Sequence, residues 1–255
     1  MDLASLAKPT SYLNSITITK AMSQQQYARA KLHAVRSRIS KICLEQRRSL
    51  NSVKLIGASK KQSPDLIREF LNLGLEDLGE NYLQEGISKI ESLIEPTPTW
   101  HFIGQIQSNK TKLIANNFDW VHGVDRLKIA TRLAKQNTRE QSVKILLQLN
   151  LDDEHSKGGV SQSQAPELAN QIAQEIESIG GAELRGFMTI PKARNTYSEQ
   201  TATFAKARNV LELTNQQFGI GLTELSMGMS GDLEAAIAEG ATMVRIGTDL
   251  FGPRD

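Results

Sequence analysis

Val53-Lys54-Leu55-Ile56-Gly57-Ala58-Ser59 is a short apolar run that ends in small residues, and such a run predicts a buried strand of a parallel sheet. Ser63 and Pro64 follow as the cap and first-turn proline of a helix, which Gly74 ends. The same alternation of strand and helix recurs along the rest of the chain. It implies parallel strands that are joined by right-handed crossovers.

The repeated units favour a closed barrel over an open sheet. Further strands are predicted at Leu75–Gly79, Trp100–Gly104, Asp119–His122, Val143–Leu149, Glu183–Gly186, Leu222–Leu225 and Met243–Ile246. Helices are predicted between them at Tyr82–Ile94, Asn109–Asn116, Arg126–Thr138, Gln164–Ile179, Ser198–Gln217 and Asp232–Glu239. Eight such strands predict a single α/β domain, a (β/α)8 TIM barrel. The alternative is a doubly wound sheet, but the glycine-rich dinucleotide loop typical of that fold is missing after the first strand.

The composition is that of a soluble globular protein and excludes several classes. Of the 255 residues, 39% are apolar and 23% are charged. The net charge of +2 gives no overall basic field, so no nucleic-acid partner is expected. No apolar run approaches the ~18 residues that a membrane span needs. The single cysteine, Cys43, cannot form an intrachain disulfide, which fits a reducing compartment and a cytoplasmic location.

The chain divides into residues 1–21, an N-terminal extension that could be disordered, and residues 22–255, the barrel domain. The extension has no apolar periodicity, so it is not expected to contribute to the core. An extra helix is predicted between Ser23 and Arg48, before the first strand. Its basic cluster is expected to coat the exposed side of the helix: Arg36, Arg38, Lys41, Arg47 and Arg48.

Lys60 stands where barrel enzymes carry their chemistry, at the carboxyl end of the first strand. It shares parity with Ile56 and Ala58, so all three belong to one face of the strand. Burial lowers the pKa of a lysine, and a neutral amine forms Schiff bases with aldehydes. Lys61 would point to the opposite side. The alternative interpretation is that both lysines are solvated in a loop.

Two loops after the last strands have the chemistry of a phosphate site. The first is Ser226-Met227-Gly228-Met229-Ser230, where small residues let the backbone approach an anion and Ser226 and Ser230 offer hydroxyls. The second is Gly247-Thr248. Barrel enzymes often bind phosphate between these two loops. Arg245 would project into the barrel mouth, and it needs a ligand or an acidic partner such as Asp77.

The four histidines carry no clear chemistry. His101 and His122 lie in or beside predicted strands, where histidines are more often core or mouth residues than bases. No spacing of His, Asp or Glu indicates a metal site.

With these features in place, the chain resembles the family of pyridoxal 5′-phosphate (PLP) homeostasis proteins, also called the YggS/PROSC family. The resemblance covers the chain from about residue 25 to its end. It rests on segments in matching order: Ala58-Ser59-Lys60, Gly79-Glu80-Asn81-Tyr82, His101-Phe102-Ile103-Gly104, Gln107-Ser108-Asn109-Lys110, His155-Ser156-Lys157-Gly158-Gly159, Arg185-Gly186-Phe187-Met188, Ser226-Met227-Gly228-Met229-Ser230 and Met243-Val244-Arg245-Ile246-Gly247-Thr248.

The resemblance implies the barrel of the alanine racemase N-terminal domain and a set of cofactor contacts. Lys60 would hold PLP as an internal aldimine, and Arg245 would face the pyridine nitrogen. Asn81 would line the pocket. The phosphate would be held by backbone amides and hydroxyls of four residues, with Ser230 beside them: Ser226, Met227, Gly247 and Thr248.

The expected function is a PLP carrier or homeostasis protein without robust catalysis, acting as a monomer. Arg245 can only donate hydrogen bonds, so the pyridine nitrogen must stay unprotonated, and the cofactor is then a weak electron sink. In alanine racemases the second base is a tyrosine of another domain, which is not expected here. The alternatives are a minor amino-acid racemase that uses Lys60, and a signalling protein that docks a partner on its Arg-rich helix. PLP-dependent apo-enzymes are the other expected protein partners.

Overall fold

The computed structural model describes residues 23–152 and 158–252, and in these ranges the chain forms one closed parallel barrel. The predicted extension, residues 1–21, lies outside the described residues, as do His155, Ser156 and Lys157 of one matching segment. The described strands pair in the order β4-β3-β2-β1-β9-β8-β7-β5-β6, and β4 also pairs with β5. That last pairing closes the sheet, so the barrel prediction is confirmed and the open-sheet alternative is wrong.

The strands of the barrel occupy nearly the positions that the sequence predicts. They are β1 (Lys54–Ala58), β2 (Asp77–Glu80), β3 (Thr99–Phe102), β4 (Trp120–Val124), β5 (Val143–Asn150), β6 (Val160–Ser161), β7 (Ala182–Thr189), β8 (Glu224–Ser226) and β9 (Met243–Ile246). The two-residue β6 pairs only with β5 and lies outside the closed ring of eight. The sequence analysis did not predict it, because two residues carry no periodicity.

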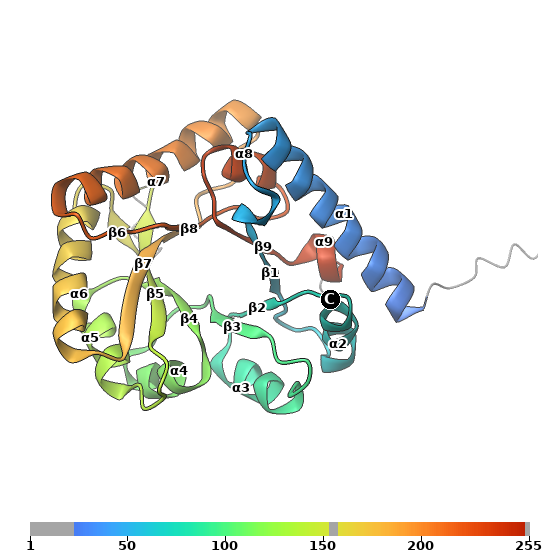
Figure 1. Cartoon of the computed structure of the whole chain (residues 1–255), viewed down its shortest axis with the longest axis horizontal. Helices are drawn as coiled ribbons and strands as arrows, with labels where there is room; N and C mark the ends of the chain where they lie inside the picture. Colours follow the sequence, from blue (N-terminus) through green and yellow to red (C-terminus); the bar gives the residue numbers. More distant parts are fainter. Residues whose placement is uncertain (1–22, 153–157, 253–255) are drawn as a thin grey trace, which may run out of the picture.

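Helices surround this barrel, as Figure 1 shows. They are α1 (Gln24–Glu45), α2 (Pro64–Asn72), α3 (Leu83–Ser92), α4 (Thr111–Asn117), α5 (Leu127–Gln136), α6 (Ala165–Ile179), α7 (Tyr197–Phe218), α8 (Leu233–Ala238) and α9 (Thr248–Phe251). The four-residue α9, which follows β9 after Gly247, is not among the predicted helices. No described helix is long and apolar enough to cross a membrane.

One strand is longer than predicted because a glycine was read as its end. The prediction stopped at Gly186, whereas β7 continues through it to Thr189. A Cβ at Gly186 would lie 1.9 Å from the backbone oxygen of Glu224 on β8, so only glycine allows the two strands to approach here. The register of β5 against β7 also shifts beside it, between Ile145 and Leu146. This glycine therefore marks an irregularity inside a strand, not a strand end.

Two apolar layers stabilise the barrel. The larger lies between the strands and the surrounding helices. The smaller fills the barrel interior and consists of Ile56, Trp120, Leu146, Met188 and Met243. The presence of Ile56 in this inner layer confirms the predicted parity of β1, whose even-numbered residues face inward.

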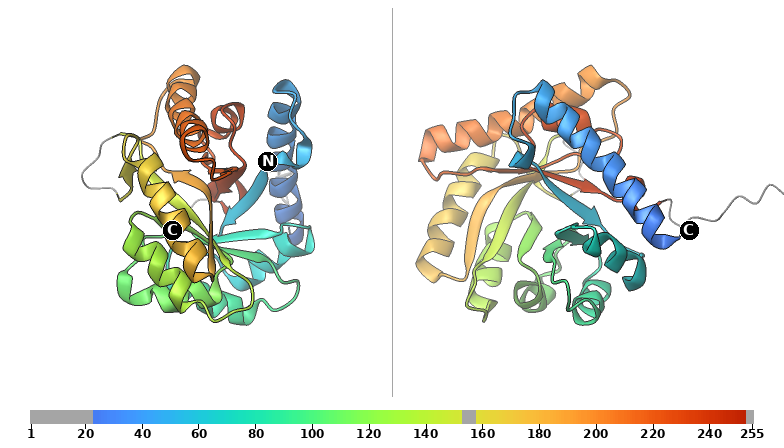
Figure 2. Two further views of the ribbon diagram at one scale, coloured as in Figure 1. Left: turned by 60° about the vertical axis from the view of Figure 1, so that its left-hand side comes forward. Right: turned by 45° about the vertical axis from the view of Figure 1, so that its right-hand side comes forward.

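Arginines on and just after the N-terminal helix α1 fix it to the outside of the barrel, and Figure 2 shows the helix lying along that wall. Arg36 donates to the carbonyl oxygens of Leu73 and Gly74, at the end of α2. Arg48 donates to the carbonyl oxygens of Ile237 and Ala241. Arg36 is exposed, as expected, although it also bonds to the end of α2, whereas Arg48 is half-buried, so the expectation of a solvated face is wrong for Arg48. Helix ends offer unpaired carbonyls that arginine can reach.

Candidate functional site

The carboxyl ends of the strands gather the predicted site residues at one mouth of the barrel. Lys60 follows β1 on its inward-facing side and is half-buried. Lys61 differs in its backbone: its φ is +62°, its side chain is exposed, and its N–H donates to Glu85 Oε1 at 2.5 Å. The left-handed turn separates the two neighbouring lysines. The geometry thus favours Lys60 as the residue at the mouth.

A buried ion cluster lies directly behind Lys60. The Lys89 ammonium, on α3, donates to Ser59 O at 2.6 Å, Glu80 Oε1 at 2.7 Å and Glu85 Oε1 at 2.7 Å. Ser59 Oγ also donates to Glu80 Oε1 at 2.7 Å. Burial raises the pKa of Glu80, and the hydrogen bonds from Lys89 and Ser59 partly offset that effect. Because Ser59 precedes Lys60, the cluster holds the turn that carries Lys60.

The two predicted phosphate loops lie against each other. Gly247 is buried at the start of α9, and Thr248, the first residue of that helix, is exposed. The N–H of Asp249 donates to Ser230 Oγ of the other loop at 3.4 Å. At Gly228, with φ of +96°, a Cβ would lie 2.5 Å from that of Ala236, so the first loop needs glycine there. The structure brings Ser230, Gly247 and Thr248 together as predicted.

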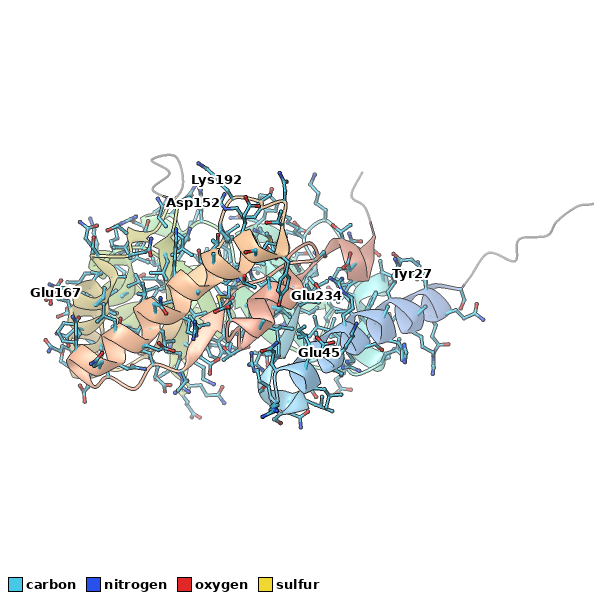
Figure 3. The ribbon with its side chains drawn as sticks, turned by 90° about the horizontal axis from the view of Figure 1, so that it is seen from above. Tyr27, Glu45, Asp152, Glu167, Lys192 and Glu234 are labelled. Carbon is cyan, nitrogen blue, oxygen red and sulfur yellow. The ribbon has the colours of Figure 1, made fainter. Side chains whose placement is uncertain are left out.

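Arg38 ties both loops to α1 from behind. Its guanidinium donates to Glu234 Oε1 at 2.7 Å, to Asp249 Oδ2 at 2.5 Å and to Ser230 O at 3.0 Å. Figure 3 shows Glu234 beside the helix that carries Tyr27 and Glu45. The prediction that Arg38 coats an exposed face is therefore wrong. The extra N-terminal helix supports the cradle of the site, although no sequence signal linked it to these loops.

Ser226 and Met227 are engaged elsewhere in this structure. The Ser226 side chain is fully buried inside the barrel, with its Oγ 2.9 Å from His122 Nδ1 and 2.5 Å from Arg245 Nη1. The N–H of Met227 donates to Met243 O at 3.1 Å, and its side chain packs in the outer core. Both residues lie under the loop, so the free donors for a phosphate must come from its neighbours.

Arg245 is the most unusual charge of the site. It is only 4% exposed, and it donates to the Ser226 hydroxyl and, at 2.9 Å, to Thr189 O. Burial lowers its pKa to about 10, and Asp232 acts weakly in the opposite direction. Within the described ranges it forms no ion pair. The predicted alternative, a pair with Asp77, is not present, because Asp77 bonds to His101 and Lys54.

These contacts fit a neutral acceptor at the mouth. A buried guanidinium has five N–H groups, and its described side-chain bonds use neutral oxygens only. An unprotonated pyridine nitrogen is an acceptor of this kind. A pyridine nitrogen that carries a proton, or that is paired with a carboxyl group, could not accept a hydrogen bond from Arg245. The residues present therefore fit PLP.

Asn81 lines a cavity of about 230 Å³ at the same mouth, together with Gly104, Gln148 and Met188. Asp152 and Lys192 lie side by side at its rim, as Figure 3 shows, and the Lys192 N–H donates to Asp152 Oδ2 at 2.6 Å. A larger cavity of about 780 Å³ lies at the opposite end of the barrel, where Lys54 and Asp77 line it. The smaller cavity lies at the carboxyl end of the strands, the end that also carries Lys60, Arg245 and the two loops, but of the predicted site residues only Asn81 is among its described lining.

Comparison with known proteins agrees with this geometry. Residues 31–255 match the family model described as alanine racemase, N-terminal domain. A pyridoxal phosphate homeostasis protein of Pseudomonas aeruginosa is 46% identical over 222 residues, covering 87% of this chain and 93% of that protein. The protein of the same name from Escherichia coli K12 is 40% identical, covering 88% of this chain and 95% of the other.

Solved structures give the same picture. PipY of Synechococcus elongatus, in the structure with PLP bound, is 35% identical with a TM-score of 0.75, covering 88% of this chain and all of that one. Alanine racemase of Corynebacterium glutamicum is 14% identical, with a TM-score of 0.62 over 89% of this chain and 61% of that one, which shows the fold alone. The chain therefore belongs to the family of pyridoxal phosphate homeostasis proteins, on the barrel of the alanine racemase N-terminal domain.

Proposed function

We propose that this chain binds PLP at the barrel mouth, with the aldehyde bonded to Lys60, and that it buffers or delivers the cofactor. The observation that carries the proposal is Arg245, a buried cation whose described partners are neutral. The relatives named for pyridoxal phosphate homeostasis, and the PLP-bound PipY structure, support it.

Each group at the mouth has a separate task in this proposal. When bound, PLP supplies an aldehyde that reacts with amines. Lys60 offers the amine, and the cluster of Glu80, Lys89 and Ser59 holds its turn in place. Gly247 and Thr248 offer a backbone amide and a hydroxyl to the phosphate, and Ser230 joins the two loops. Asn81 lines the space beside the ring.

The same residues favour a carrier over an enzyme. A pyridine ring is a strong electron sink only when its nitrogen is protonated or paired with an acid. Arg245 offers a donor at that position, and no described carboxylate pairs with it. Proton removal at the α-carbon of an amino acid thus gains little stabilisation. A minor racemase activity through Lys60 is the second candidate, because alanine racemases share the barrel.

Two measurements on the purified protein test the proposal. Borohydride reduction of PLP-loaded protein, followed by peptide mapping, should locate the adduct on Lys60, and Lys61→Ala should leave it unchanged. An adduct on Lys61, or none, would overturn the assignment. Incubation with L-alanine in deuterated water separates the two functions. Exchange of the α-proton at about 1 per second or faster would favour the racemase.

The partners of a carrier would be PLP itself and PLP-dependent apo-enzymes that receive it. We further propose that the chain is a monomer and that it works in the cytoplasm, where it would buffer a reactive aldehyde. Because Arg36, Arg38 and Arg48 already bond to the barrel, α1 offers less free basic surface to a signalling partner than its sequence indicates. Light scattering of the purified chain tests the monomer.

A further inference from the structure

The barrel interior holds a row of polar side chains that the proposed function does not use. It runs from Lys54 and Asp77, which line the cavity at the far end, through two buried histidines to the mouth. We propose that Asp77, His101, His122 and Ser226 form a one-way hydrogen-bond relay that positions Arg245 as a fixed donor toward the ring nitrogen of PLP. The inference rests on the proposed function.

The contacts are continuous from end to end. Lys54 Nζ lies 3.1 Å from Asp77 Oδ1, and the same oxygen lies 2.9 Å from His101 Nε2. His101 Nδ1 lies 2.9 Å from His122 Nε2, and His122 Nδ1 lies 2.9 Å from Ser226 Oγ. Arg245 Nη1 closes the row at 2.5 Å from that hydroxyl. Both histidine side chains are fully buried.

The two ends of the row determine its direction. Arg245 can only donate, and an ionised Asp77 can only accept. With both imidazoles neutral, His101 must donate from Nε2 to Asp77 and accept at Nδ1. His122 then donates from Nε2 and accepts at Nδ1 the single proton of the Ser226 hydroxyl. In the opposite direction, an unprotonated Nε2 of His101 would face the Asp77 oxygen, and both atoms are acceptors.

Burial favours the neutral histidines that this order needs. It lowers the pKa of His101 and His122, and the positive charge of Arg245 lowers that of His122 further. Asp77 opposes the effect at His101 without reversing it. The ring of His101 also stacks on Trp120, with centroids 5.7 Å apart and planes 9° apart. The relay is therefore held in one geometry by packing as well as by hydrogen bonds.

The consequence falls on Arg245. Its hydroxyl partner cannot rotate its proton toward the guanidinium, because His122 holds that proton. The guanidinium thus donates from Nη1 to Ser226 Oγ and from Nη2 to Thr189 O, which sets its plane before any ligand arrives. The negative charge of Asp77 reaches Arg245 only through oriented neutral groups. The ring nitrogen would consequently face a full cation that forms an ion pair with no carboxylate of the described residues.

The first experiment observes the relay directly. Nitrogen NMR of histidine-labelled protein reports which ring nitrogen carries the proton. His101 and His122 should both be Nε2–H tautomers at neutral pH, with or without PLP. A positively charged imidazole at either position, or an Nδ1–H tautomer, would overturn the relay. His33 on α1 is exposed and serves as the internal reference.

The second experiment measures what the relay does for the cofactor. Affinity is compared for PLP and for an analogue in which C–H replaces the ring nitrogen. The chain should prefer PLP about tenfold or more, because a charge-assisted hydrogen bond is lost with the analogue. His122→Phe should bring the two affinities close together, and His33→Phe should keep the preference.

The outcomes separate the relay from the function on which it rests. If neither compound binds the unchanged chain, the proposed function fails. If both bind and His122→Phe keeps the full preference for PLP, the function stands and the relay is wrong. Ser226→Ala removes the neighbouring hydroxyl and leaves both histidines in the chain. It should reduce the preference for PLP over the analogue in the same way. It provides the second test if His122→Phe does not fold.

Discussion

Lys89→Met gives the sharpest test of how the site is held. The ammonium of Lys89 is buried, and its three N–H groups match its three described acceptors on Ser59, Glu80 and Glu85. Methionine keeps most of the volume and removes the charge. The Glu80 carboxylate, which is fully buried, is then left with the Ser59 hydroxyl alone; its Oε2 already lacks a described partner.

Removing one partner of a buried ion pair lowers the free energy of unfolding by about 3–5 kcal/mol. We expect a loss in this range at pH 8, which is a large part of the about 5–15 kcal/mol that a domain has. The loss should shrink in acid. Without Lys89 the pKa of Glu80 rises further above its unfolded value, so protonation at lower pH removes the unpaired charge in the folded state.

Urea denaturation measures the effect, provided that the dependence of the unfolding free energy on urea concentration is the same for each variant. The double variant Lys89→Met with Glu80→Gln should recover most of the loss, because no buried charge remains. Lys112→Met on the exposed side of α4 is the matched control and should change stability by less than about 0.5 kcal/mol. A loss below about 1 kcal/mol for Lys89→Met would refute this account of the cluster. So would a double variant that is no more stable than the single one.

Three further predictions concern the phosphate, the histidines and the extension. Thr248→Ala should weaken PLP binding by about 1.5–3 kcal/mol, and Gly247→Val by more, in an absorbance titration; equal binding of pyridoxal and PLP by the unchanged chain would contradict the site. Burial lowers the pKa of His101 and His122 in the folded chain, so the unfolded chain binds more protons and stability should fall as the pH drops below about 6.5, by up to about 2.7 kcal/mol per pH unit beyond the carboxylate contribution. Urea midpoints of His122→Phe should show a shallower slope there, and an unchanged slope would refute the neutral state. A chain that begins at Met22 should melt and bind PLP like the full chain; a large drop in melting temperature would show that residues 1–21 pack on the barrel.

The sequence predicts what depends on local pattern. Alternating strands and helices give the barrel, and the period of two along β1 places Lys60 on the side of Ile56. The loops with Ser230 and Gly247 follow from their position after the last strands. Gly186 shows the limit of such reasoning, because its meaning depends on the approach of Glu224 from another strand.

The charges were harder to predict because their partners are distant in the sequence. Arg38 reads as a surface arginine, yet its partners lie about 200 residues later in the chain. Lys89 reads as a helix-surface lysine until the packing of α3 brings it to Glu80. For Asp77, His101 and His122 a signal existed: each lies at an inward-facing position of its strand. Register between strands, which the sequence does not contain, was needed to turn those positions into contacts.

Ser226 shows how one hydroxyl decides between two roles. It has a single proton, and the relay directs that proton to His122 Nδ1 while the oxygen accepts from Arg245. A hydroxyl used in this way cannot also donate to a phosphate. Loss of the hydroxyl should therefore weaken PLP and pyridoxal by the same factor, whereas loss of the Thr248 hydroxyl should weaken PLP alone. One serine and one threonine of the same mouth, Ser226 and Thr248, would then act on opposite ends of the cofactor, and the ratio of the PLP and pyridoxal affinities tells their roles apart.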